Sequence, residues 1–324
     1  MSLMASMRHR DCPVCGAPER IALEFMKASF DEGRLTSSSF SSRKSPEFMS
    51  YRLVRCAACT TVFASEAPAA RALAGAYHVA DYGSAAEAAL AASVYRVALA
   101  PFLSKLTARG VALEIGAGTG VFLSHLRDLG FEQPVGIEPS AAAIAAAAVE
   151  VKPLLREGVF TGDEFPAESV SLVCCFQTLE HVPEPRELVE AAYRMLAPGG
   201  MIALVTHDYT AFINRLLGSR SPIMDIEHLQ LFCPAALNYL VGAAGYEVLS
   251  VGSIRNVYPL GYWISLLPLP TGMKRALLAA AASAKIARAQ IRLDVGNLLT
   301  VAQKPYDGRD FVNLNDAPKT VAPP

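Results

Sequence analysis

The sequence predicts an α/β fold in which a doubly wound, largely parallel sheet follows a small cysteine-rich module. Two observations predict this arrangement. Between residues 111 and 206, short apolar stretches that suit buried strands alternate with helical patterns, as in parallel βαβ units. Before this region lie two C-x-x-C pairs. A chain of 324 residues has room for both parts.

Composition and the N-terminal sequence predict a cytoplasmic protein. The formal net charge of −1 gives no general attraction to nucleic acid or to anionic membranes. Although 52% of the residues are apolar, no uninterrupted run of eighteen apolar residues occurs, so we expect no transmembrane segment. The first residues lack a basic region followed by an apolar core, so we expect no export signal and no disulfide framework.

The four N-terminal cysteines, Cys12, Cys15, Cys56 and Cys59, predict a structural zinc site. Each C-x-x-C pair can wrap two thiolates around one tetrahedral ion, and two pairs close the coordination sphere. A redox centre would need only one pair, so zinc is preferred, with redox chemistry, iron–sulfur ligation or uncoordinated thiols as alternatives. We interpret residues 1–66 as a zinc ribbon. The other three cysteines, Cys174, Cys175 and Cys233, are expected in the core.

A glycine-rich loop indicates a nucleotide-like cofactor. In Glu114-Ile-Gly-Ala-Gly-Thr-Gly120 the glycines permit positive φ, and the following helix start aims N–H groups at a ligand. Glu138 ends the next predicted strand, 134–138, and would lie beside this loop. A carboxylate there can hold both hydroxyls of a ribose. An adenosine-type cofactor is therefore implied.

The spacing of the glycines and one charge decide which cofactor this is. A dinucleotide site needs G-x-G-x-x-G, whereas this chain has G-x-G-x-G followed by Val121. Glu114 lies within a strand that a parallel sheet would normally make continuously apolar. Its carboxylate suits a cationic group, such as the amino group of a methionine moiety, better than a pyrophosphate.

Together with Leu179-Glu-His-Val182, these motifs resemble the class I S-adenosylmethionine-dependent methyltransferases over about residues 75 to 303. The resemblance implies a seven-stranded, Rossmann-like sheet whose last strand is antiparallel, with S-adenosyl-L-methionine as cofactor. In similar enzymes a tyrosine of the leader segment, here Tyr77 or Tyr82, covers the methionine end. The cofactor-binding residues that we expect are Tyr82, Glu114, Gly116, Ala117, Gly118, Gly120, Glu138, Pro139, Phe160 and Gln177.

The remaining elements follow in order within a methyltransferase domain placed at 67–303. The strand at 170–177 should lie beside the first strand, where the strand order reverses, so the residues after it face the reactive end of the cofactor. The other expected elements are helices at 120–130, 141–149, 185–196 and 234–244, and strands at 201–206, 246–254 and 297–303.

Three histidines are candidate general bases. His181 follows the strand at 170–177, His207 follows the strand at 201–206, and His228 lies in the loop before the helix at 234–244. A hydroxyl acceptor must lose a proton, which an imidazole accepts well near neutral pH. For each histidine the alternative is a structural, hydrogen-bonded or loop-ordering role.

Residues 256–290 interrupt the expected closing hairpin and are interpreted as a lid. They are rich in aromatic residues and proline, and could stack a sugar or aromatic ring or hold an isoprenoid tail, the alternative being a packed cap. The basic residues of a helix expected at 273–290 suit a solvated face, or a phosphate. Residues 304–324 are polar and proline-rich, and we expect disorder there.

We predict methyl transfer to a small molecule, preferably to a hydroxyl of a sugar or glycan intermediate. This preference rests on a resemblance. A zinc-knuckled N-terminus joined to this core is similar to the arrangement in the deoxysugar methyltransferases. One alternative is an RNA methyltransferase, but residues 1–59 carry nine Lys and Arg against six Asp and Glu, a weak stripe for phosphate binding. The other is a cofactor-binding, non-catalytic regulator. No oligomeric state is specified.

Overall fold

The fold was analysed in a computed structural model, which describes residues 3–42 and 46–306. A central sheet has the strand order β12-β13-β10-β9-β6-β7-β8. Strands β6 to β10 are parallel, whereas β13 runs antiparallel to both of its neighbours. The predicted seven-stranded sheet with an antiparallel last strand is confirmed. The strands are β6 Val111–Ile115, β7 Gln133–Glu138, β8 Leu155–Glu157, β9 Val170–Phe176, β10 Leu196–His207, β12 Glu247–Pro259 and β13 Gln290–Gln303.

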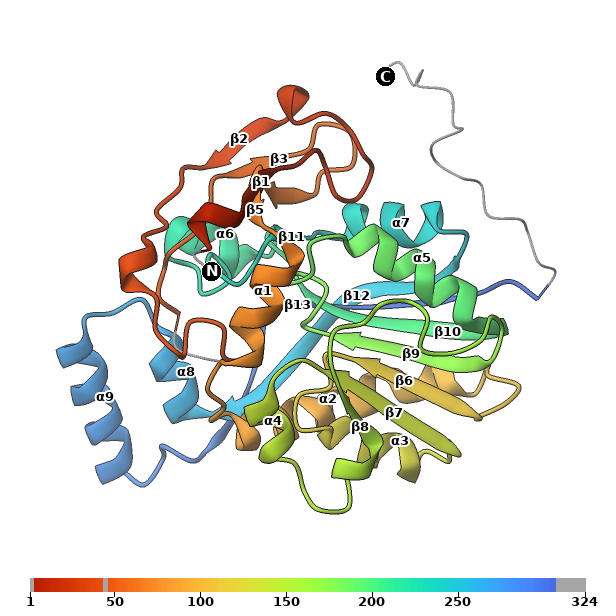
Figure 1. Cartoon of the computed structure of the whole chain (residues 1–324). Helices are drawn as coiled ribbons and strands as arrows, with labels where there is room; N and C mark the ends of the chain where they lie inside the picture. Colours follow the sequence, from red (N-terminus) through yellow and green to blue (C-terminus); the bar gives the residue numbers. More distant parts are fainter. Residues whose placement is uncertain (1–2, 43–45, 307–324) are drawn as a thin grey trace.

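Helices cover both faces of this sheet (Figure 1). Alternate residues of β9 enter two separate cores, as the two-residue repeat of a strand requires: Val173 and Cys175 on one face, Leu172 and Cys174 on the other. Helices α5 and α7 pack on the first face, and α2 and α3 on the second. The helices are α1 Ala70–His78, α2 Ala85–Leu103, α3 Val121–Asp128, α4 Ala141–Ala145, α5 Pro185–Met195, α6 Phe212–Leu217, α7 Pro234–Ala243, α8 Leu260–Leu266 and α9 Thr271–Ser283.

Helix α2 is long and apolar enough to cross a membrane, by length and composition only. It is alone in this among the helices of residues 3–42 and 46–306. One face of α2 packs on the sheet through Tyr95, Leu99 and Leu103, which are buried. Helix α2 therefore packs one face on the sheet, while its other face, which includes Val97, is exposed.

The N-terminal module is a small antiparallel structure that shares a sheet with the rest of the chain. Its strands are β1 Met7–His9, β2 Leu23–Met26, β3 Leu53–Arg55, β4 Val62–Ala64 and β5 Glu66–Pro68. A strand from the segment between α6 and α7, β11 Gln230–Leu231, pairs with β4 and gives the order β11-β4-β3-β2. Short 3₁₀ turns complete the fold at Met4–Ser6, Glu19–Ile21, Glu32–Arg34, Lys152–Leu154 and Gly218–Arg220.

The closing hairpin is longer than the sequence predicted. Strands β12 and β13 stay paired as far as Pro259 and Gln290, so only residues 260–289 leave the sheet, forming α8 and α9. The strand extends because Tyr258 is buried and packs against Trp263 of α8, with ring centroids 5.2 Å apart. Helix α9 ends at Ser283 rather than at 290, and Lys285 then takes a left-handed backbone conformation, with φ of 58°.

The prediction of disorder from residue 304 onward is wrong for Lys304. Lys304 is buried, its backbone N–H donates to the Gly200 carbonyl, and its ammonium group donates to the Leu196 carbonyl at 2.9 Å. These contacts hold Lys304 in the fold. The rest of that prediction, residues 307–324, lies outside the described residues.

Candidate active site

A cavity of about 1100 Å³ opens at the carboxyl ends of the parallel strands. One half is lined by the glycine loop after β6, by Glu138 and by residues 158–161. The other half is lined by the three histidines and by residues of α6 and α8. Pockets for single small ligands measure roughly 300–1,000 Å³, so this cavity has room for a cofactor beside an acceptor.

The glycine loop shapes the first half of the cavity. Gly116 and Gly118 both have positive φ, 73° and 56°. A Cβ atom at Gly116 would collide with the side chain of Thr178, so this glycine lets the loop pack against the segment after β9. A Cβ atom at Gly118 would meet nothing within 4 Å, so this glycine leaves the loop open to a ligand.

Gly120 lies differently from its neighbours in the loop. Its neighbours in the loop line the cavity, but Gly120 does not. A Cβ atom there would lie 2.6 Å from Val151, so the position needs glycine for the packing of α3 against the segment before β8. The other expected cofactor residues all line the cavity: Tyr82, Glu114, Gly116, Ala117, Gly118, Glu138, Pro139, Phe160 and Gln177.

Two backbone N–H groups fix the carboxylate of Glu138 at the end of β7. The N–H of Gly118 donates to Oε2 at 2.7 Å, and the N–H of Ser140 donates to Oε1 at 2.8 Å. Burial raises the pKa of Glu138, and these two donors oppose that rise. The carboxylate is held at the cavity wall in one orientation, as an acceptor for the two hydroxyls of a ribose must be.

Other expected cofactor residues are buried or strained. Glu114 is only 5% exposed within β6. Gln177, directly after β9, has a φ of 50°, a conformation costly for a residue other than glycine and often found at functional sites. The hydroxyl of Tyr82 is buried with no hydrogen-bond partner among the described residues. A bound ligand would supply a partner for this hydroxyl.

The three histidines meet on the opposite wall of the cavity. The ring of His228 lies 4.9 Å from that of His181 and 5.1 Å from that of His207, centroid to centroid. They come from three separate segments: the turn after β9, the end of β10 and the loop before β11. Sequence reasoning named each histidine separately, and the fold brings them together.

Hydrogen bonds orient all three rings and define the tautomer of one. The Nδ1 atoms of His181 and His228 lie 3.1 and 2.9 Å from the carbonyl oxygens of Glu227 and Ile223, respectively. A carbonyl can only accept, so Nδ1 of His228 carries hydrogen and the lone pair of its neutral ring is on Nε2. Nδ1 of His181 also lies 2.8 Å from the Tyr77 hydroxyl, which can donate or accept. His207 contacts the amide of Asn297 through Nδ1 at 2.8 Å.

Sequence reasoning missed several polar contacts of this wall. The Tyr77 hydroxyl lies 2.8 Å from Nδ1 of His181, so it orients a candidate base rather than the cofactor. Asn297 donates to Asn256 at 3.0 Å and thereby links β13 to β12 beneath His207. Nothing in the local sequence marks these contacts, because the partners are distant along the chain.

Glu180 lies beneath the histidines and is fully buried. Its carboxyl accepts a hydrogen bond from the backbone N–H of His207 at 2.6 Å. Burial nevertheless raises the pKa of Glu180 to about 8. Glu180 is therefore largely a neutral acid near pH 7, and it ties the turn after β9 to the end of β10.

The acceptor half of the cavity also has an apolar wall. Helix α8 and the turn that follows it contribute aromatic and aliphatic side chains, and α6 contributes two more. These residues are Tyr262, Trp263, Leu266, Leu267, Pro268, Ile213 and Leu217. An acceptor in this half would meet polar groups on one side and apolar groups on the other.

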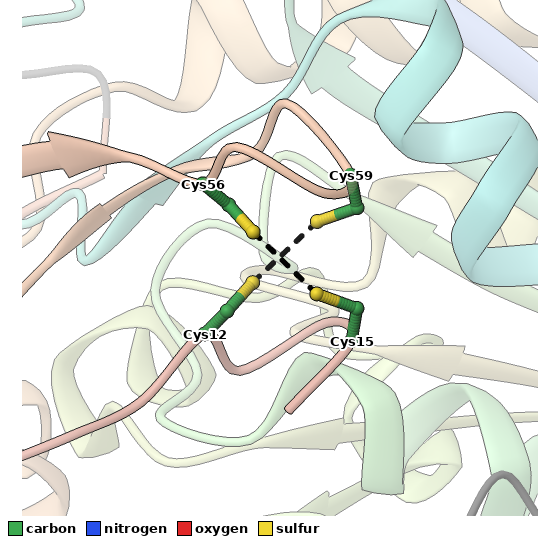
Figure 2. Close-up of side chains that lie close together, drawn as sticks. All are labelled: Cys12, Cys15, Cys56 and Cys59. Atoms are coloured by element: carbon green, nitrogen blue, oxygen red, sulfur yellow. Dashed lines mark hydrogen bonds between the residues drawn. The ribbon is translucent and has the colours of Figure 1, made fainter. Parts of the chain in front are cut away.

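The four N-terminal cysteines form one cluster (Figure 2). All four sulfur atoms lie within 4.8 Å of one another, and Cys12–Cys59 and Cys15–Cys56 are 3.5 Å apart. A tetrahedral zinc–thiolate site, with bonds of about 2.3 Å, places its sulfur atoms about 3.8 Å apart. The donor set and its spacing therefore fit a zinc ion.

Two matching turns build this cluster. In the first, the N–H of Gly16 donates to the Cys12 carbonyl, and in the second the N–H of Thr60 donates to the Cys56 carbonyl. Gly16 and Thr60 both have positive φ, 72° and 64°. The two C-x-x-C segments thus take the same hairpin-like shape and present their sulfur atoms to a common centre.

Comparison with known proteins places the chain in a family. The sequence pattern of the methyltransferase-domain family matches residues 85–251, slightly more than half of the chain. The chain therefore belongs to this family, and its sheet is that of a class I S-adenosylmethionine-dependent methyltransferase.

Curated relatives match part of the domain. The chain is 30% identical over 118 residues to a ubiquinone biosynthesis O-methyltransferase of Pseudomonas putida (strain GB-1), covering 33% of this chain and 49% of the relative. It is 33% identical over 103 residues to the corresponding protein of Pseudomonas savastanoi pv. phaseolicola, covering 29% and 43%. The chain thus spans about half the length of the curated relatives it matches.

Solved structures are similar at low identity. An S-adenosylmethionine-dependent methyltransferase from Archaeoglobus fulgidus is 15% identical, with a TM-score of 0.44, over 66% of this chain and 94% of that one. Geranyl diphosphate C-methyltransferase from Streptomyces coelicolor A3(2) is 14% identical, with a TM-score of 0.41, over 64% and 77%.

Replacing Glu138 tests the cofactor half of the cavity. Glu138→Ala should weaken S-adenosylmethionine binding by about 1.5–3 kcal/mol, the value of a hydrogen bond to a charged group. Titration calorimetry measures this affinity, and Glu132→Ala, an exposed acid just before β7, is the matched control. Equal affinities for Glu138→Ala and the unsubstituted protein would contradict the ribose assignment.

Metal analysis tests the cysteine cluster. Freshly purified, reduced protein should contain about one zinc ion per chain, and Cys56→Ser should lose it because three thiolates bind far more weakly than four. Cys233→Ser, outside the four-sulfur cluster, should keep the metal. Both variants should bind the cofactor as the unsubstituted protein does, because the ribbon contributes no residue to the glycine loop. Reduced protein without metal would refute the site.

Glu180→Gln should alter how stability depends on pH. The carboxyl has a pKa near 4.5 when unfolded and about 8 when folded, so the protein loses stability as pH rises through this window. The glutamine keeps an acceptor for His207 but cannot ionise. The variant therefore lacks this decrease in the free energy of unfolding, which is up to about 1.4 kcal/mol for each pH unit. Thermal melts from pH 5 to pH 9 should show the stability of the variant rising relative to that of the unsubstituted protein. A stability difference that stays constant over this range would contradict the raised pKa.

Proposed function

We propose that the protein transfers a methyl group from S-adenosyl-L-methionine to a hydroxyl oxygen of a small molecule. One observation carries the proposal: three histidines line the cavity wall that faces the glycine loop. When bound, the cofactor supplies an activated methyl group on a sulfonium, which needs little help to react. The protein's task is to align the acceptor, exclude water and accept its proton.

Named residues can perform each task. Glu138 and Glu114 would hold the ribose and the methionine amino group, while Tyr82 offers an unpartnered hydroxyl over them. His181, oriented through Nδ1 by Glu227 and Tyr77, would act as the base in its neutral form. The ribbon and helix α8 help to enclose the cavity, because Phe40 and Trp263 both line it.

The acceptor that we propose is a hydroxylated ring. A sugar or glycan intermediate remains the preferred class, supported by the polar wall of histidines and of Asn256 and Asn297. A second candidate, a hydroxylated aromatic ring with an apolar substituent, is favoured by the apolar wall at α8. The relatives named as ubiquinone biosynthesis O-methyltransferases favour oxygen as the attacked atom in either case.

One labelling experiment separates these classes from their rivals. The protein is incubated with methyl-labelled cofactor and a fractionated cell extract, and the label is followed into small molecules, polysaccharide, RNA and protein. Label in RNA would favour an RNA methyltransferase, and cofactor binding without any transfer would favour a non-catalytic regulator. A cytoplasmic location remains part of the proposal and is tested by cell fractionation.

The base assignment predicts a specific kinetic effect. His181→Ala should lower kcat by about 10²–10⁴ and barely change cofactor affinity, because proton removal is felt only in the transition state. The rate of the unsubstituted enzyme should fall as pH drops and the imidazole takes up a proton.

Tyr77→Phe is the graded control for this variant, since it removes one contact to Nδ1 while the Glu227 carbonyl remains. It should slow the reaction less than His181→Ala. If His181→Ala kept full kcat, or lost cofactor affinity in proportion to activity, His181 would be a loop-ordering residue. His207 and His228 would then be tested as the base.

A further inference from the structure

The arm formed by residues 260–289, which holds α8 and α9, belongs to a stretch of unusual charge. Residues 248–293 contain no Asp or Glu, although the whole chain has 30 acidic and 29 basic residues. The same stretch carries six basic residues: Arg255, Lys274, Arg275, Lys285, Arg288 and Arg292. A nearly neutral chain therefore contains one strongly positive segment.

Four of these cations are exposed without a compensating acid. Arg275, Lys285, Arg288 and Arg292 all lie on the surface. None of them forms an ion pair within the part of the chain that the structure describes. The arm thus presents unneutralised positive charge to its surroundings.

Apolar side chains are exposed on the same arm. Met273 and Leu277, one helical turn apart on α9, are 51% and 39% exposed, and Ile286 just beyond the helix is 48% exposed. Ala280 and Ala284 extend the stripe of Met273 and Leu277, and both are also exposed. Helix α9 therefore carries an apolar stripe that no other part of the described chain covers.

The position of α9 explains why this stripe is uncovered. Leu278, on another side of the helix, lies near Gly261 at the start of α8, and the backbone after α9 bonds back to Leu260 and Gly261. Figure 1 shows α9 at the edge of the molecule, with α8 between it and the sheet. The apolar stripe therefore does not contribute to either core.

The exposed apolar surface also continues into the cavity. Leu267, 41% exposed, and Leu293, 40% exposed, both line the acceptor half as well. Leu267 lies within the arm, directly after α8, and Leu293 lies in β13, shortly after the arm rejoins the sheet. An amphiphilic molecule held at the arm would meet the mouth of the cavity directly.

We infer that the arm of residues 260–289 is a docking element for an anionic lipid surface. Exposed apolar side chains can enter the headgroup region while neighbouring cations meet anionic headgroups. A second copy of this chain fits less well, because a two-fold interface would bring like charges together. Nucleic acid would use the cations but leave the apolar stripe exposed. Delivery of an amphiphilic acceptor to the cavity is a consequence that rests on the proposed function; the docking itself does not.

Vesicle binding tests the inference without any methyl transfer. The full chain is sedimented with vesicles of phosphatidylcholine alone, or with phosphatidylglycerol added. Binding should be about tenfold stronger to the anionic vesicles and should fall as salt rises. The double variant Met273→Ser/Leu277→Ser should lose about tenfold in binding, and Arg288→Gln/Arg292→Gln should lose most of the preference for phosphatidylglycerol.

Two controls keep this test decisive. Val149→Ser removes an apolar side chain, 82% exposed, far along the chain from the arm, and should bind like the unsubstituted protein. Cofactor affinity measured on each variant shows that it is folded. No binding to either vesicle, or equal binding by the Met273→Ser/Leu277→Ser variant, would overturn the inference. The inference would also be overturned if light scattering showed that the unsubstituted protein is a dimer and that the Met273→Ser/Leu277→Ser variant is a monomer.

Discussion

The buried side-chain amide of Gln230 connects the turn after β9, the N-terminal module and β11. Its Nε2 donates to the carbonyls of Leu179 and Val182, which flank His181, at 2.6 and 2.8 Å. Its Oε1 accepts from Arg10 of the N-terminal module at 3.1 Å, and its backbone lies in β11, paired with β4. Because Gln230 is fully buried, water does not compete for these bonds, and the three segments hold one another in place.

This connection gives the N-terminal ribbon a role in the active site. Arg10 also donates to the Pro183 carbonyl at 2.8 Å, and although burial lowers its pKa to about 10, it stays charged near neutral pH. Tyr209 donates to the Thr60 carbonyl beside the cysteine cluster at 2.7 Å. The cluster therefore supports the histidine wall across the β11–β4 pairing, whereas the cofactor loop rests on β6 and β7. The two halves of the cavity have separate supports.

The same division explains how much the sequence could predict. The cofactor half is built from residues close in sequence, so the glycine loop, Glu138 and the strand order were predictable from motif and periodicity. The C-x-x-C pairs, although distant from each other, were predictable because metal ligands have strict spacing. The acceptor half depends on long-range contacts, such as Tyr77 with His181, 104 residues apart. The packing of Gly120 against Val151 could not be predicted either, because Val151 belongs to a later segment.

The net charge of the whole sequence likewise does not predict the charge of a single surface. A net charge of −1 describes attraction at long range, where opposite charges cancel. At a surface, only charges within about 10 Å matter, because salt screens the rest. The acid-free stretch of residues 248–293 lies on one hairpin and its arm. The acidic residues elsewhere in the sequence therefore do not neutralise its cations. A neutral chain can therefore carry a cationic face, and this face lies beside the apolar mouth of the cavity.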